Sequence, residues 1–114
     1  MTYEVRHTAE HEWRAAADTM RAALLFPPST DADWERPNIA DSWRDGMSLS
    51  AWDGAHCIGH AGALDFEMMV PGGARVPMAG VTRVGVRSTH RRQGVLTAMM
   101  ERLLRESAER GQVL

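Results

Sequence analysis

The hydrophobic positions in the first half of the chain follow a helical spacing. Residues 2–7 can form a short strand, after which Thr8 offers an N-cap to a helix that Pro27 and Pro28 end. The apolar positions of this helix, three or four residues apart, are Trp13, Ala16, Ala17, Met20 and Leu24. A second helix is expected around residues 33–43, and Pro37 stands where it can break that helix.

From Met47 onward the pattern changes to the period of two that is typical of strands. The expected strands cover residues 47–52, 56–69 and 80–87, and the turns between them fall at residues 53–54 and 71–73. On the last of these strands Thr82, Val84 and Val86 are predicted to share one face. The three strands are expected to run as a meander.

The clearest helix follows a polar loop at residues 88–93, begins at Gly94 and is closed by Gly111. Its predicted apolar face consists of Leu96, Met99, Met100, Leu103, Leu104 and Ala108. Residues 112–114 have the character of a strand that has just begun. Since the strand over residues 80–87 needs a neighbour on its far edge, residues 1–114 are expected to be a fragment of a larger domain.

Composition narrows the class of protein. A chain of 114 residues, 44% of them hydrophobic, is enough for one modest core. No apolar run approaches the roughly 20 residues that cross a bilayer, and no leader-like segment is recognised, so a cytoplasmic protein without membrane contact is expected. Cys57 is the only cysteine, which excludes an internal disulfide. The net charge of −2 argues against a surface devoted to nucleic acid.

Arginines gather in one acid-free stretch. Between Glu67 and Glu101 there is no acidic residue. The arginines of that stretch are Arg75, Arg83, Arg87, Arg91 and Arg92. The last two precede a helix N-terminus, where free backbone N–H groups favour an oxyanion, and Gly94 lets the oxyanion approach the main chain closely. The pattern predicts a diphosphate site; the alternative is an exposed loop that binds nothing.

One segment resembles the acetyl-CoA motif of the enhanced intracellular survival (Eis) family, within the GNAT superfamily of N-acetyltransferases, which reads roughly V-x-V-x-P-T-H-R-R-R-G-L-L. The segment is Val84-Gly85-Val86-Arg87-Ser88-Thr89-His90-Arg91-Arg92-Gln93-Gly94-Val95-Leu96-Thr97. The likeness extends over residues 64–110. Leu96 departs from the wider superfamily pattern, Gln/Arg-x-x-Gly-x-Gly/Ala, and agrees with Eis. The resemblance implies an α/β (α+β) fold: the N-terminal portion of a GNAT domain over residues 1–114, with a mixed, mostly antiparallel sheet flanked by helices.

The resemblance also implies binding roles. Backbone groups of Val84, Gly85 and Val86 are expected to bond the pantetheine arm of acetyl-CoA, and a main-chain N–H on this strand to polarise the thioester carbonyl. The other residues expected to bind acetyl-CoA, chiefly at its diphosphate, are Arg91, Arg92, Gln93, Gly94, Val95, Leu96 and Thr97. Gly85 has a competing interpretation as a glycine that makes room for a packed helix.

The function that the resemblance implies is direct transfer of an acetyl group from acetyl-CoA to a primary amine, such as an aminoglycoside or a lysine-like acceptor, by a homo-oligomer. In the family the general acid is a tyrosine from a later segment and the general base is the carboxylate that ends the full-length chain. Neither is found in these residues, and Tyr3 cannot be assigned the acid's role. The catalytic residues therefore stay unassigned, and the activity of this chain alone is left open.

Three aromatic residues and two acids are further candidates. Phe26, Trp34 and Trp43 are predicted to line the acceptor cleft, because family members place aromatic side chains from these helices there; the alternative is a place in the core. Asp65 and Glu67, on one face of a strand, are candidates for a base that acts through water.

A metal site is not expected. On a strand His56 and His60 would stand roughly 13 Å apart, too far for one ion. Cys57 lacks a helix N-terminus that would activate it as a nucleophile. Two competing functions remain: a GNAT-fold module that binds acyl-CoA or a protein partner without catalysis, and nucleic-acid binding, which the lack of aromatics among the arginines disfavours.

Overall fold

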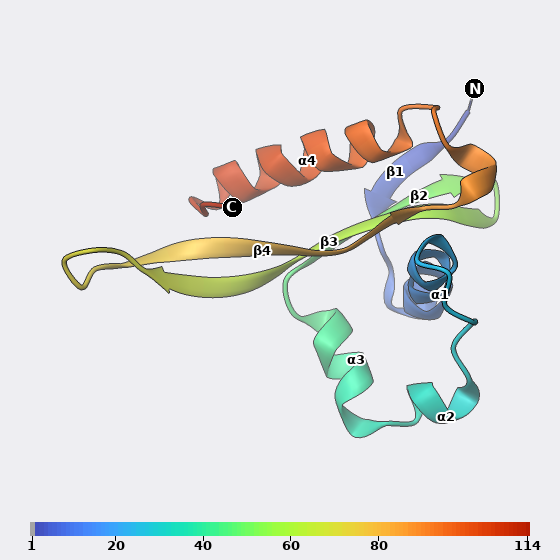
Figure 1. The fold of residues 1–114 in the computed structure, drawn as a ribbon, viewed down its shortest axis with the longest axis horizontal. Helices are drawn as coiled ribbons and strands as arrows, with labels where there is room; N and C mark the ends of the chain where they lie inside the picture. The colour runs from blue at the N-terminus through green and yellow to red at the C-terminus, as the bar shows by residue number, and fades with distance from the viewer. Residues whose placement is uncertain (1) are drawn as a thin grey trace.

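The computed structural model describes residues 2–114 as one antiparallel sheet with helices on both faces (Figure 1). The strands are β1 (Glu4–His7), β2 (Met47–Asp53), β3 (His56–Met69) and β4 (Arg75–Val86), in the order β1-β2-β3-β4. Helix α4 (Val95–Glu109) covers one face, and α1 (Trp13–Ala23), α2 (Asp31–Trp34) and α3 (Pro37–Arg44) lie on the other. Single 3₁₀ turns, η1 (Glu10–Glu12) and η2 (Ser88–His90), precede α1 and α4. The predicted fold class is confirmed.

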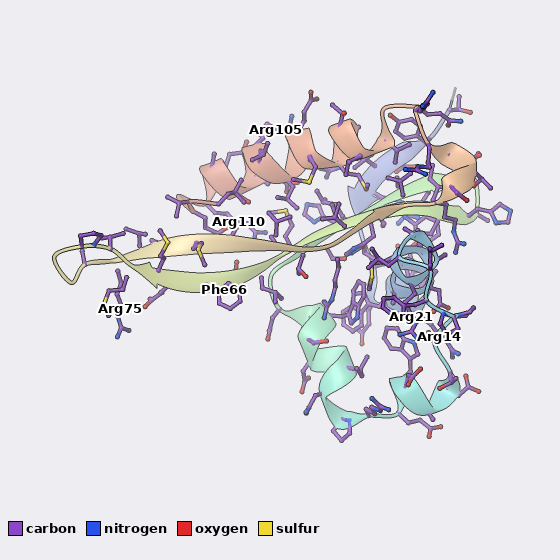
Figure 2. The ribbon with its side chains drawn as sticks, in the orientation of Figure 1. Arg14, Arg21, Phe66, Arg75, Arg105 and Arg110 are labelled. Atoms are coloured by element: carbon purple, nitrogen blue, oxygen red, sulfur yellow. The ribbon has the colours of Figure 1, made fainter. Side chains whose placement is uncertain are left out.

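Strands β3 and β4 form a long hairpin whose turn projects beyond the helices (Figure 1). Arg75 lies in this projecting part, whereas Phe66 lies across the sheet from the end of α4 (Figure 2) and is half exposed. Strand β4 begins earlier than residue 80 because Pro77 is tolerated within it. The Pro77 nitrogen lacks a hydrogen, but β4 is the edge strand of the sheet, where proline breaks no ladder hydrogen bond.

The hydrophobic core has two layers. On the α4 side the buried residues are Met47, Leu49, Ala51, Ile58, Ala61, Ala63, Ala79, Val95, Met99 and Leu103. The buried stripe of α4 repeats every four residues, from Val95 to Ser107. Leu96 and Leu104 were predicted on this face but are about half exposed, because the helix is rotated toward Val95.

No helix within residues 2–114 is long and apolar enough to span a bilayer.

The start of α1 differs from the prediction. The Thr8 hydroxyl does not cap a helix; it is hydrogen bonded to the hydroxyls of Ser48 and Ser50 on β2. Helix α1 begins only at Trp13, after η1. It ends at Ala23, so Leu24 lies outside it and is exposed. The predicted break at Pro37 is confirmed: Pro37 occupies the first position of α3, where its missing N–H costs nothing.

A bulge interrupts the pairing of β3 with β4. Gly62 pairs with Thr82, but His60 pairs with Gly85, so β4 has one residue more than β3 between these two pairs. Arg83 at the bulge has a φ of +55°, in the left-handed region. The prediction that Thr82 and Val84 share a face is therefore wrong, because the extra residue reverses the alternation.

Candidate functional site

The second half of β4 has an open edge. A parallel bridge covers the first half: the Val113 N–H donates to the Pro77 carbonyl (2.9 Å), and the Ala79 N–H donates to the Val113 carbonyl (2.7 Å). At the other end the Arg87 N–H donates to Ile58 on β3 (2.8 Å). Backbone groups of successive strand residues point to opposite edges. The backbone N–H and C=O groups of Gly85 therefore face β3, as those of Arg87 do, whereas the backbone groups of Val84 and Val86 face the open edge.

Gly94 opens helix α4 without a side-chain cap. Its φ is +78°, and its carbonyl accepts the first helical hydrogen bond, from Ala98 N–H (2.9 Å). The amides of Val95, Leu96 and Thr97 consequently have no acceptor within the helix. Gly94, Leu96 and Thr97 are exposed, while the Val95 side chain is buried in the core. The first turn of α4 therefore offers backbone donors to an anion, and it contains no acidic residue.

Tyr3 fixes the loop that leads into this turn. Its hydroxyl donates to the Gln93 carbonyl (3.3 Å), and a Cβ built on Gly94 would stand 3.6 Å from the Tyr3 oxygen. Gln93 itself is partly buried and Gly94 is exposed. Sequence reasoning missed this contact, because nothing local links residues 90 positions apart.

A groove of about 500 Å³ joins the open edge to the start of α4. It is lined by Ala22, Ala23, Leu24, Leu25, Val84, Gly85, Val86, Ser88, Arg91 and Leu96. The predicted acetyl-CoA residues on β4 thus share one cavity with Arg91 and Leu96. The exposure of Leu96 follows from this position: it faces the groove instead of the core.

The five arginines of the acid-free stretch are not one cluster. Arg75 lies near Glu67 on the projecting hairpin (3.5 Å). The Arg83 guanidinium donates to Ser42, and Arg87 Nε donates to the Cys57 carbonyl (2.9 Å). Only Arg91 and Arg92 lie beside the first turn of α4, both exposed, and no ion pair within residues 2–114 engages them.

Gly85 is required by helix packing. A Cβ at this position would come within 2.8 Å of the Ala23 Cβ, and Met20 lies next to it. The competing interpretation, a glycine that makes room for a helix, is therefore confirmed. Its close approach to α1 also shapes the floor of the groove.

The predicted acceptor-cleft aromatics lie apart from the groove. Trp43 is 7% exposed and packs in a cluster with Ala16, Ala17, Trp52 and Cys57. Trp34 packs against that cluster, and Phe26 is exposed near Arg21. None of the three lines the groove beside β4.

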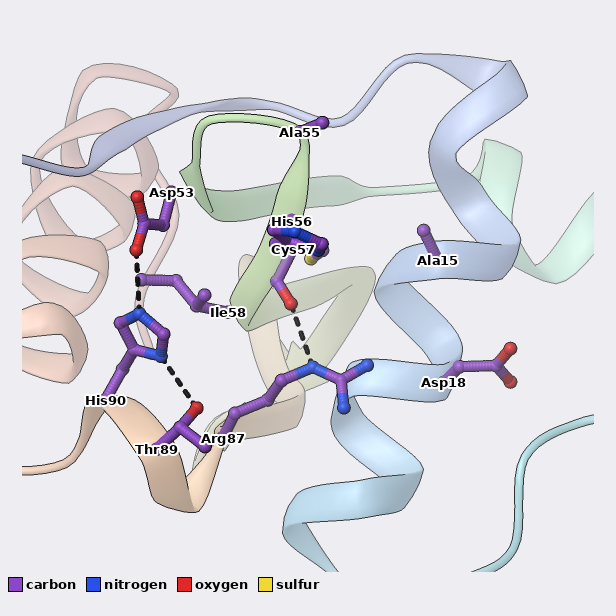
Figure 3. Close-up of a pocket in the computed structure, with 10 residues that line it drawn as sticks. All are labelled: Ala15, Asp18, Asp53, Ala55, His56, Cys57, Ile58, Arg87, Thr89 and His90. Atoms are coloured by element: carbon purple, nitrogen blue, oxygen red, sulfur yellow. Dashed lines mark hydrogen bonds and ion pairs between the residues drawn. The ribbon is translucent and has the colours of Figure 1, made fainter.

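A second cavity, of about 520 Å³, lies between the β2–β3 hairpin, α1 and the segment after β4 (Figure 3). Three of its polar side chains engage one another, and a fourth engages the backbone. His90 bonds the Asp53 carboxylate (2.9 Å) and the Thr89 hydroxyl (2.7 Å). Arg87 occupies the floor through its bond to the Cys57 carbonyl (Figure 3).

The remaining candidates take structural positions. His56 lies at the surface of the second cavity, whereas His60 is fully buried. Cys57 is buried, and burial raises the pKa of its thiol, which disfavours a nucleophile. Within residues 2–114 no three metal-binding side chains come together.

The two acids on β3 are engaged in the projecting hairpin. Asp65 accepts a hydrogen bond from Gln112 (2.7 Å), and Glu67 lies near Arg75. Neither lines the groove beside β4.

Comparison with known proteins agrees with this geometry. The profile described as "Acetyltransferase (GNAT) domain" matches residues 4–114. An uncharacterized N-acetyltransferase of Streptomyces avermitilis is 43% identical over 114 residues, which cover 100% of this chain and 27% of the relative. The N-acetyltransferase Eis of Mycobacterium tuberculosis is 33% identical over 102 residues, covering 82% of this chain and 25% of Eis.

A crystal structure of an Eis protein also matches this fold. Eis1 from Mycobacterium abscessus superposes with a TM-score of 0.77 and 32% identity, over 97% of this chain and 26% of Eis1. The chain thus spans about a quarter of the length of the relatives it matches. With the profile covering nearly all of its residues, the chain belongs to the GNAT acetyltransferase family and corresponds to the N-terminal part of its Eis-like members.

Proposed function

We propose that this chain binds acetyl-CoA in the groove beside β4 and serves the transfer of its acetyl group to a primary amine. One observation carries the proposal: open backbone groups of β4 and free amides of the first turn of α4 border the same groove. A long ligand with an amide-bearing arm and a diphosphate matches these two kinds of partner.

The roles of the residues follow from their positions. The backbone groups of Val84 and Val86 would bond the pantetheine arm, and the apolar end of α1 would cover it. The amides of Leu96 and Thr97 would hold the diphosphate, with Arg91 and Arg92 beside them. Acetyl-CoA supplies an activated thioester; an N–H at the open edge of β4 suits stabilisation of negative charge on its carbonyl oxygen.

The acceptor is proposed from likeness to Eis. A primary amine on an aminoglycoside or a lysine-like molecule fits the expectation drawn from the sequence, as does a homo-oligomeric assembly. No tyrosine within residues 2–114 takes the role of general acid, because Tyr3 holds the Gln93 carbonyl. The catalytic residues remain unassigned.

Calorimetric titration with acetyl-CoA tests the binding. The expected result is one site per chain; no detectable binding at millimolar acetyl-CoA would overturn the proposal. Release of free CoA thiol in the presence of tobramycin, lysine or a simple alkylamine then tests transfer. Binding without thiol release for any amine would favour a non-catalytic acyl-CoA-binding module.

A further inference from the structure

His60 is a fully buried histidine with two hydrogen-bond partners. Its Nδ1 lies 2.6 Å from the Arg83 carbonyl and its Nε2 lies 2.7 Å from the Ser48 hydroxyl. A carbonyl oxygen only accepts, so Nδ1 carries the hydrogen in the neutral ring, and Nε2 is the unprotonated nitrogen that faces the Ser48 hydroxyl. Burial lowers the pKa of His60 to about 4, which keeps the ring neutral.

The carbonyl that His60 holds belongs to the bulge. Arg83 has a φ of +55°, a left-handed conformation that is unfavourable for a residue other than glycine. The guanidinium of Arg83 is held as well: it lies 4.5 Å from the centre of the Trp43 ring and donates to the Ser42 carbonyl (3.0 Å). The His60 ring packs against Trp43, with ring centres 5.0 Å apart. Contacts at both ends of Arg83 thus maintain its unfavourable backbone conformation.

The bulge sets which edge of β4 the backbone N–H and C=O groups of each residue face. Before it, Pro77 and Ala79 bond outward to Val113. If the alternation ran on unbroken, odd-numbered residues would face outward throughout, and Val84 and Val86 would face β3. The extra residue reverses the alternation, so that Val84 and Val86 face the open edge and Arg87 bonds β3.

We propose that His60 is a positioning residue of the groove: through the Arg83 carbonyl it holds the bulge that turns the backbone groups of Val84 and Val86 outward. As a role in ligand binding, this rests on the proposed function, since it is acetyl-CoA that would use those groups. His60 does not line the groove itself, and its contribution passes through Arg83.

Two amide substitutions separate its two hydrogen bonds. In His60→Asn the amide nitrogen takes nearly the position of Nδ1 and keeps a donor for Arg83. In His60→Gln the amide reaches the position of Nε2 and keeps a partner for Ser48, but Arg83 loses its donor. Both variants lose the aromatic ring against Trp43, so a purely structural role lowers the stability of both alike.

The first measurement needs no ligand. Amide hydrogen exchange is followed by NMR in the unliganded chain, with Leu49 and Ala61 of the central strands as internal references. In the wild type and in H60N, the Gly85 and Arg87 amides should be protected and the Val84 and Val86 amides should exchange fast. In H60Q, Gly85 and Arg87 should exchange at least tenfold faster relative to the references. An unchanged pattern in H60Q would overturn the positioning role.

The second measurement is acetyl-CoA affinity by calorimetry. We expect H60N to bind within about threefold of the wild type and H60Q at least tenfold more weakly. Equal affinities in H60N and H60Q would also count against the proposal. If the exchange pattern is as expected but the wild type binds no acetyl-CoA, the proposed function fails while the control of the bulge by His60 stands.

Discussion

Two cavities among residues 2–114 have nearly the same volume but differ in the hydrogen-bonding groups that line them. In the cavity at the β2–β3 hairpin, His90 is paired with Asp53 and Arg87 is bonded to a backbone carbonyl. In the groove beside β4, two strand residues face an open edge, the first turn of α4 has free amides, and Arg91 is exposed. Open backbone groups therefore distinguish the groove beside β4 from the hairpin cavity, although the two volumes are nearly the same.

The largest expected effect comes from a charge placed at the free amides. Gly94→Asp puts a carboxylate where the diphosphate is proposed to sit, and we expect acetyl-CoA to bind at least 100-fold more weakly by calorimetry. Gly111→Asp is the matched control, because Gly111 has a similar φ (+72° against +78°) at the far end of α4 and has free space around it. Both variants bear the same backbone strain. Equal affinity in the two would contradict the assignment of the groove.

The pH dependence of folding stability tests the burial of His60, the residue proposed to hold the bulge beside the groove. His60 has a folded pKa of about 4, below its ordinary value of 6.5, because burial disfavours the charged ring more than the hydrogen bond to the Arg83 carbonyl favours it. The unfolded chain binds the proton more readily, so stability is lost as the pH falls from 6.5 toward 4. Between pH 7 and pH 5 the loss should be about 2 kcal/mol.

Urea denaturation at these two pH values measures that loss. His60→Asn removes the titrating ring, so the variant should lose distinctly less stability over the same range. The pKa of Glu12, lowered to about 2 chiefly by its hydrogen bond with Arg6, adds a loss mainly at more acidic pH. An identical pH dependence in the wild type and H60N would contradict the assignment.

A smaller effect is expected from the exposed arginines. Arg92→Ala should weaken acetyl-CoA binding about tenfold, because a charged hydrogen-bond donor is lost beside the diphosphate. The fold should be retained, since Arg92 is exposed. Arg105→Ala, on the outer face of α4 (Figure 2), is the control and should bind as the wild type does. If both variants bind alike, Arg92 has no part in the site.

The smallest effect is expected in the hairpin cavity. Asp53→Asn removes the charge that pairs with His90 and leaves the groove beside β4 unaltered. Acetyl-CoA affinity should change less than twofold by the same calorimetry. A tenfold loss would show that the ligand reaches the hairpin cavity, and the comparison of the two cavities would then have to be reversed.

Local sequence patterns predicted the helices and strands better than they predicted which face of each element is buried. The strand and helix order, the break at Pro37 and the glycine that opens α4 were all visible in the sequence. The rotation of α4 was not, because Val95 and Leu96 are equally apolar and only the sheet decides which one is buried. The same applies to Thr8, whose hydroxyl meets serines some 40 residues away instead of a helix end.

The pattern of residues alone predicts the kind of site, because an acid-free stretch with arginines before a glycine at a helix start is a local feature that favours an anion. Which groups are available to such a site depends on the tertiary structure. Pairing with β3 removes Gly85 from the open edge, the packing of Ser42, Cys57 and Glu67 engages three of the five arginines, and a buried histidine fixes the bulge. Each of these depends on contacts between distant parts of the chain, which no local pattern encodes.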